Sequence, residues 1–134
     1  MSRYKFRVWD KEFEETLTQD EGTFQYRDRY DYWVTDLEDA MGNPERFTIM
    51  QYTGLKDVNG VEIYEGDIAT MIVFKDNAEY LGYVVFENGC FCLNISLDGA
   101  KYKVPASEWK ETETIITVIG NVYENPALLE RELE

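Results

Sequence analysis

Residues 51–68 read QYTGLKDVNGVEIYEGDI, and this stretch constrains the fold more than any other part of the chain. Gly54, Gly60 and Gly66 recur every six residues, with apolar or aromatic side chains between them. Because glycine adopts a positive φ without steric cost, this spacing predicts a series of tight turns. Asn59-Gly60, between two short apolar segments, is a strong signal for a two-residue hairpin turn. We therefore interpret the stretch as a structural joint between strands.

A loop that carries chemistry is the alternative interpretation of the same stretch. A phosphate-binding loop would require Gly-Lys-Ser/Thr after the glycines, and this pattern is absent. Asp67, which directly follows Gly66 at the start of an apolar segment, is the first acidic residue to consider for catalysis. We favour a structural role, in which its carboxylate accepts hydrogen bonds from the turn amides of residues 65–68. The predicted structural turn residues are Gly54, Gly60, Gly66 and Asp67.

Turn signals of the same kind continue toward the C-terminus. Asn88-Gly89 separates residues 80–87 from 90–97, and Asp98-Gly99 ends the second of these segments. Turns about ten residues apart, joined by β-branched and aromatic runs, predict an antiparallel meander. Further strands are expected at residues 46–52, 66–74 and 114–120, and a short helix is expected after Pro126. Curling so short a sheet into a barrel would remove its edges.

The N-terminal part is predicted to be a separate β-rich region. Residues 3–8 alternate basic and apolar side chains, which is the period of a half-buried strand. Its basic face forms a candidate basic stripe of Arg3, Lys5 and Arg7. Gly-Asn-Pro at residues 42–44 is a turn signal, so we place a boundary near residues 42–45. The predicted domains are residues 1–45 and 46–134, although the two could pack as one.

The composition predicts an acidic, folded chain. Hydrophobic residues make up 44% of the 134 residues, which is enough apolar surface for a core without metals or disulfides. The net charge of −14 repels phosphates at long range, so general nucleic-acid binding is disfavoured. No apolar run reaches the roughly 18 residues of a membrane span, and no signal peptide is recognisable. We therefore expect a cytoplasmic protein that does not bind membranes.

The residue types that usually carry catalysis or metals are scarce. The chain has no histidine, which excludes Ser-His and Cys-His nucleophile systems. Cys90 and Cys92 supply two of the roughly four ligands of a structural zinc site, so metal binding would need a second subunit. Thiols two residues apart on a strand lie near the upper limit for a disulfide, and we predict two reduced thiols. We predict no catalytic residues, no metal site, no cofactor and no enzymatic activity.

Three blocks span nearly the whole chain: YKFRVWDKE (4–12), MQYTGLKDVNGVEIYEGDI (50–68) and VIGNVYENPALL (118–129). In this order they resemble the YopX family of phage- and prophage-encoded bacterial proteins. The resemblance implies a mostly β protein whose C-terminal half is a small SH3-like barrel, and an intracellular, phage-associated role. It implies no activity, since the family is uncharacterised. The expected fold is mainly β (α+β): an N-terminal β subdomain, an SH3-like barrel and a short C-terminal helix.

Residues 24–34, FQYRDRYDYWV, lie outside these three blocks and interleave aromatic side chains with Arg and Asp. Such a composition suits a protein interface or single-stranded nucleic acid. Local neutralisation of the arginines by Asp28 and Asp31, with the aromatic side chains in a core, is the structural alternative. The candidate partner-binding residues are Tyr26, Arg27, Arg29, Tyr30, Tyr32 and Trp33.

Our leading hypothesis is a non-enzymatic phage accessory protein, a small adaptor that binds a protein partner or itself. It would do so through residues 24–34 and through unpaired strand edges. The alternative is a nucleic-acid-related protein, which is either an acidic DNA mimic that occupies a basic host protein or a weak direct binder of nucleic acid. The identity of the partner, the host process and the oligomeric state do not follow from the sequence.

Overall fold

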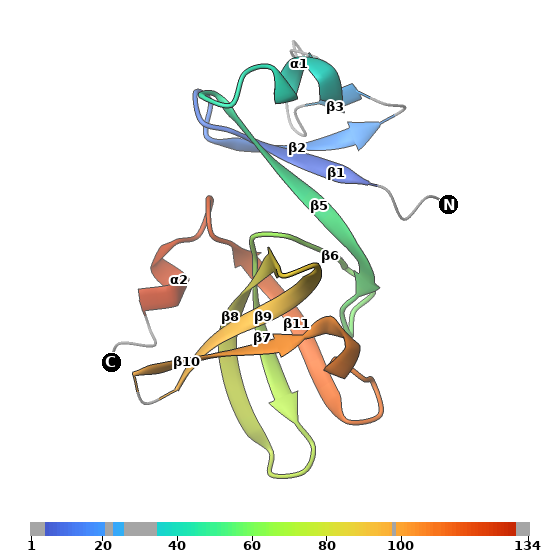
Figure 1. Cartoon of the computed structure of the whole chain (residues 1–134), viewed down its shortest axis with the longest axis vertical. Helices are drawn as coiled ribbons and strands as arrows, with labels where there is room; N and C mark the ends of the chain where they lie inside the picture. Colours follow the sequence, from blue (N-terminus) through green and yellow to red (C-terminus); the bar gives the residue numbers. More distant parts are fainter. Residues whose placement is uncertain (1–4, 21–22, 26–34, 98, 131–134) are drawn as a thin grey trace. The chain divides into compact units, whose positions relative to one another are not determined.

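The computed structural model describes residues 5–20, 23–25, 35–97 and 99–130, and within them the chain is mostly β (Figure 1). These described residues form two antiparallel sheets, two short α-helices and one 3-10 turn. The chain divides into two compact units, residues 1–52 and 53–134. The expectation of a mainly β protein is therefore confirmed.

The first unit is a twisted antiparallel sheet with one helix. Its strands follow the order β4-β3-β2-β1-β5, with β1 between β2 and β5. The elements are β1 (Phe6–Asp10), β2 (Glu15–Asp20), β3 (Thr23–Gln25), β4 (Thr35–Asp36), α1 (Leu37–Met41) and β5 (Phe47–Lys56).

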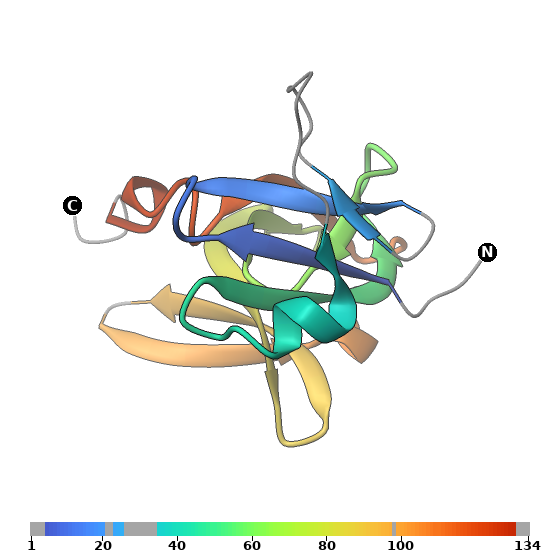
Figure 2. The same ribbon diagram turned by 90° about the horizontal axis from the view of Figure 1, so that it is seen from above.

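Helix α1 covers one face of this sheet (Figure 2). Asp36 begins the helix, because its carboxylate accepts a hydrogen bond of 2.8 Å from the backbone N–H of Asp39. Ala40 is the buried residue of the helix and joins an apolar cluster in which every member is buried. The other buried members of that cluster are Val8, Leu17, Phe24 and Phe47.

Asp10, at the end of β1, is a buried carboxylate that fixes the turn into β2. It accepts hydrogen bonds from the N–H groups of Glu12 and Phe13, at 3.0 and 3.3 Å. Arg46 donates to the same carboxylate through Nε and Nη2, at 3.0 and 3.1 Å. A buried charge with several charge-assisted donors is stabilised, whereas the same charge without them would be costly. This contact joins the β1–β2 turn to the residue that precedes β5.

The second unit contains a curled five-stranded antiparallel sheet in the order β10-β9-β8-β7-β11. Its core contains Ile63, Ala69, Met71, Val84, Leu93 and Ile95. The elements are β6 (Glu62–Tyr64), β7 (Asp67–Val73), β8 (Ala78–Glu87), β9 (Cys90–Leu97), β10 (Ala100–Pro105), η1 (Ala106–Glu108), β11 (Thr114–Asn121) and α2 (Ala127–Glu130).

The predicted meander is confirmed, but its closure into a barrel is not. Successive strands from β7 to β10 pair in order, and β11 pairs with β7. Between the described residues of β10 and β11 no ladder is formed, so the hydrogen-bonded order is that of an open sheet with two edge strands. The short helix expected after Pro126 is present as α2.

The boundary between the units lies later than the predicted position at residues 42–45. Residues 47–51 pair with β1 and therefore belong to the first unit, which ends at Tyr52. The turn signal at residues 42–44 instead separates α1 from β5. Strand β5 also extends to Lys56, beyond the predicted end at residue 52.

The Asp10 contact generates a prediction for stability. Asp10→Ala removes the buried acceptor of two backbone amides and of Arg46, and we expect a loss of about 3 kcal/mol in the free energy of unfolding. Urea denaturation measures this loss. Glu12→Ala is the matched control, since Glu12 also pairs with Arg46, at 3.0 Å, but its side chain is 60% exposed. The control should lose less than about 1 kcal/mol; equal losses would contradict the assignment.

Candidate functional site

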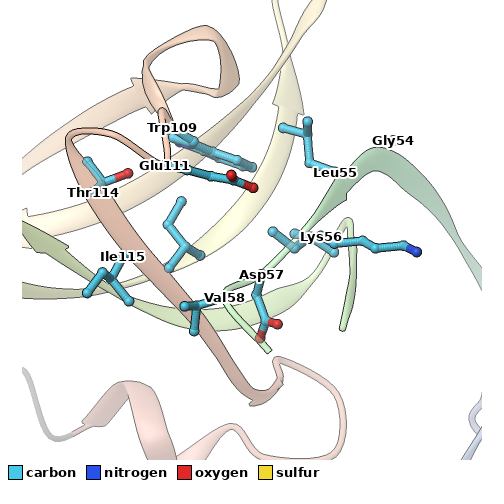
Figure 3. Close-up of a pocket in the computed structure, with 11 residues that line it drawn as sticks. Gly54, Leu55, Lys56, Asp57, Val58, Trp109, Glu111, Thr114 and Ile115 are labelled. Carbon is cyan, nitrogen blue, oxygen red and sulfur yellow. The ribbon is translucent and has the colours of Figure 1, made fainter. Parts of the chain in front are cut away.

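A groove in the second unit combines a concave shape with exposed apolar side chains (Figure 3). It has a volume of about 470 Å³ and lies between the end of β5, the turn that follows, the segment after η1, and β11. Its apolar lining includes Leu55, Val58, Ile63, Trp109 and Ile116. Lys56, Asp57 and Glu111 add charged groups.

Two apolar side chains of the groove are exposed to solvent. Val58 is 60% exposed and Leu55 is 38% exposed. Trp109 is partly buried, and its Nε1–H donates a 3.0 Å hydrogen bond to the carbonyl of Val104, which fixes the indole ring. A fixed aromatic ring beside exposed aliphatic side chains is typical of the centre of a protein interface.

Asp57 anchors the turn that forms one wall of the groove. Oδ1 accepts hydrogen bonds from the N–H groups of Asn59 and Val61, at 2.8 and 2.9 Å, and Oδ2 accepts one from Val118, at 2.9 Å. The side chain is buried, with 7% of the residue exposed. The carboxylate therefore holds the turn together and attaches it to β11.

The backbone of the same turn also contacts the outer edge of β11. The N–H of Val58 donates a 3.0 Å hydrogen bond to the carbonyl of Ile116. Because β11 is an edge strand of its sheet, this contact covers backbone groups that would otherwise face solvent. Asp57 and Val58 thus act as a short cover for this edge.

The conformation at Asn59-Gly60 differs from the two-residue turn that the dipeptide predicted. Gly60 has a φ of +82°, but Asn59 is not among the described residues with positive φ. Gly60 N–H donates to the carbonyl of Asp57, and Asp57 N–H donates to the carbonyl of Val61, which gives a three-residue loop ending in a left-handed glycine. The Asp57 carboxylate explains the difference, because it binds the amides on both sides of Gly60. At Asn88-Gly89 both residues have positive φ, as the two-residue turn requires.

A second joint surrounds Gly66 and Asp67. Gly66, with a φ of +83°, donates its N–H to the carbonyl of Val84 and accepts a hydrogen bond from the N–H of Val122. Asp67 is 1% exposed and accepts a 2.8 Å hydrogen bond from the N–H of Tyr64. Asp67 also pairs with Asn121 in the ladder between β7 and β11. The acidic residue singled out in the sequence therefore lies inside the fold and contacts turn backbone.

Of the other predicted site residues that the structure describes, Gly54 lies at the groove, and Lys5 and Arg7 belong to the first unit. Tyr26, Arg27, Arg29, Tyr30, Tyr32, Trp33 and Arg3 lie outside the described residues. Arg7 is buried at 9% exposure, and its Nε lies 3.4 Å from the sulfur of Met50. Lys5 is partly buried, with its ammonium 5.9 Å from the centre of the Tyr52 ring. Gly54 has a φ of +88° and lies at the groove.

Residue-by-residue reading of the sequence missed the groove itself. Asp57, Val58, Trp109 and Ile116 come from three separate segments, and their proximity depends on how β11 pairs with β7. One local signal was available for Asp57. An Asp two residues before Asn-Gly is well placed to accept backbone hydrogen bonds within a turn.

A wider cavity of about 700 Å³ lies on the inner side of the curled sheet. Met71, Val73, Ile95 and Val104 form its walls, and charged residues including Glu108, Lys110 and Glu113 lie around it. Met71 and Ile95 are core residues that are less than 10% exposed. This cavity is therefore an opening into the core, and the groove remains the better candidate for binding.

In the described part of the chain, no group of three or more His, Cys, Asp or Glu side chains is arranged to hold a metal ion. No helix in the same ranges is both long and apolar enough to cross a bilayer.

The Asp57 contacts generate a second prediction. Asp57→Ala leaves three backbone N–H groups without their acceptor, and we expect a loss of about 3 kcal/mol in the free energy of unfolding. Asp76→Ala is the matched control, because Asp76 lies in an exposed turn and accepts a single 3.0 Å hydrogen bond, from the N–H of Ala78. Its loss should be about 1 kcal/mol or less. Urea denaturation of both variants checks this, and equal losses would show that Asp57 does not act as the joint.

Comparison with known proteins provides the family. The YopX protein family model matches residues 5–130. The SPbeta prophage-derived uncharacterized protein YopX of Bacillus subtilis (strain 168) is 38% identical over 73 residues, which is 54% of this chain and 54% of that protein. The matched stretch thus spans about half of that curated relative.

Two crystal structures share the fold. Protein EF1440 from Enterococcus faecalis is 25% identical, with a TM-score of 0.58 over 94% of this chain and 97% of that chain. Protein yopX from Bacillus subtilis is 24% identical, with a TM-score of 0.58 over 95% and 98% of the respective chains. Since the YopX family model matches residues 5–130, which is nearly the whole sequence, the chain belongs to the YopX protein family.

Proposed function

We propose that this protein is a non-enzymatic, prophage-associated adaptor that binds a protein partner through the groove beside Asp57. The observation that carries the proposal is the exposure of Val58 and Leu55 next to the fixed ring of Trp109. Exposed apolar side chains around a pre-formed groove lose unfavourable hydration when a partner covers them. The prophage association rests on membership of the YopX family and on the name of the Bacillus subtilis relative.

The groove replaces strand edges as the favoured binding surface. Strand β10 carries Lys101 and Lys103, and lysine on an edge strand disfavours pairing with another chain. The opposite edge, β11, is partly covered by the Val58–Ile116 hydrogen bond and by Asp57. Side-chain docking in the groove therefore has more support than the addition of a strand.

The charge of the chain indicates what the partner presents. With a net charge of −14, the protein attracts basic surfaces, and Glu111 places one acidic side chain in the groove itself. Charge complementarity of this kind accelerates association and selects partners. We therefore propose a partner segment with an apolar anchor flanked by Lys or Arg. The SH3-like character of the second unit is part of the same proposal, supported by its curled five-stranded sheet.

Affinity capture tests the adaptor proposal. Tagged protein is recovered from host lysate with and without nuclease treatment, and the bound proteins are identified by mass spectrometry. Val58→Asp places a charge in the apolar contact, so we expect recovery of the partner to fall at least about 10-fold. Because Val58 is 60% exposed, the variant should fold normally.

Phe74→Ser is the matched control for capture. Phe74 is 45% exposed and is not part of the groove lining. Its recovery of the partner should equal that of the unaltered protein. Undiminished capture by Val58→Asp would refute the groove as the binding site. Loss of the captured protein when DNA is added as a competitor would favour the DNA-mimic alternative, and recovery that requires intact nucleic acid would favour direct binding.

A further inference from the structure

Cys90 and Cys92 place two thiols next to each other on the C-terminal sheet. Both are free cysteines of β9, and their sulfur atoms are 3.5 Å apart. Cys90 is exposed, whereas Cys92 is 5% exposed. Residues two apart on a strand point to the same face. A ligand that reaches Cys90 from solvent is therefore within reach of the second sulfur.

Polar side chains from three strands surround these thiols on the same face. Glu87 of β8 pairs with Cys90 in the ladder and forms an ion pair with Lys103 of β10. Asn94 donates a 2.9 Å hydrogen bond from Nδ2 to the hydroxyl of Tyr83. Its Oδ1 atom is buried and accepts no hydrogen bond among the described residues. The pair thus joins an exposed thiol, Cys90, to a buried one, Cys92, on a face of the sheet that also carries polar side chains.

A disulfide between Cys90 and Cys92 is disfavoured by their geometry. The sulfur separation of 3.5 Å must shrink to about 2.05 Å, while Cα atoms two residues apart on a strand are near the upper limit for a bridge. A strained disulfide is readily reduced by cellular thiols, so the dithiol is the stable form under reducing conditions. Structural zinc is also poorly matched, because it takes four ligands and the described residues offer no cluster of three.

A soft trivalent ion has the coordination that the pair can satisfy. With bonds of about 2.3 Å to each sulfur, a value typical of metal–thiolate bonds, a separation of 3.5 Å gives a sulfur–ion–sulfur angle of about 100°. That angle suits a pyramidal trivalent centre such as arsenic or antimony. A mono-substituted arsenic(III) centre needs two sulfurs, since its third bond is to its own substituent.

We propose that Cys90 and Cys92 form a chelating dithiol that binds mono-substituted arsenic(III) compounds. With an aryl arsenic(III) oxide, two S–H bonds and the arsenic–oxygen bonds break. Two arsenic–sulfur bonds form, and the oxygen leaves with both protons as water. No electron is transferred, so no oxidant or reductant is required. Burial raises the pKa of Cys92 and favours its protonated form, and the protons of both thiols are consumed in the water that leaves.

Phenylarsine oxide is the probe for this site. The full-length protein is treated with one equivalent under reducing conditions, and the intact mass is measured before and after an excess of 2-mercaptoethanol. We expect one phenylarsenic group per chain. The protein should keep this group in the presence of the monothiol 2-mercaptoethanol and lose it when the dithiol 1,2-ethanedithiol is added. Because the second bond forms intramolecularly, Cys90→Ser should lose the adduct to monothiol at least about 100-fold faster. Cys90 is exposed, so this variant should fold.

A variant with the same number of thiols separates chelation from simple thiol reactivity. Cys90→Ser combined with Ser96→Cys keeps two thiols on β9 but places them four residues apart, about 13 Å along the strand. It should lose the adduct as rapidly as Cys90→Ser alone. Retention of the adduct by this double variant or by Cys90→Ser would overturn the proposal, as would release from the unaltered protein by monothiol.

Discussion

The hydrogen bonds accepted by the Asp57 carboxylate are the constraint on which the second unit depends. One oxygen holds the amides of Asn59 and Val61 in the turn after β5, and the other holds the amide of Val118 in β11. Asp57 and Val118, which are 61 positions apart in the chain, are thereby held together. A buried carboxylate requires such donors, and the edge strand β11 requires a cover for its outward amides. The amide of Val118 supplies a donor to the carboxylate, and the carboxylate covers that amide. The groove lies beside this contact.

Gly66 and Asp67 repeat this arrangement at the other end of the same sequence block. Gly66 accepts a hydrogen bond from Val122, and Asp67 pairs with Asn121, so both joints connect residues 50–68 to residues 118–129. These are two of the sequence blocks through which the chain resembles its family. Their juxtaposition explains why the middle block combines left-handed glycines with buried acidic residues. The block is a pair of joints that fix β11, and the groove lies beside the first joint.

The strands were predictable wherever local patterns determine them. Alternating and apolar segments located β7, β8, β9 and β11, and Asn88-Gly89 between β8 and β9 has the two positive φ values expected of its turn. Asn59-Gly60 has the same dipeptide but a different turn, because the Asp57 carboxylate competes for its amides. The sheet remains open between the described residues of β10 and β11, contrary to the predicted barrel. Neither this opening nor the groove was predictable in detail, since both depend on which distant strands pair. The alternating pattern of residues 3–8 predicted a half-buried strand with Arg7 on its basic face. In the structure Arg7 is buried as well as Val8, so both faces of β1 are covered at this point.

Amide hydrogen exchange of the unaltered protein, followed by NMR, tests the central role of Asp57 most directly. The N–H of Val118 lies on an edge strand and is protected through its bond to the Asp57 carboxylate. We expect Val118 and Val61 to exchange as slowly as amides within the β7–β8 ladder. Exchange of both amides at the rate of an exposed turn, with the β7–β8 ladder still protected, would contradict the account.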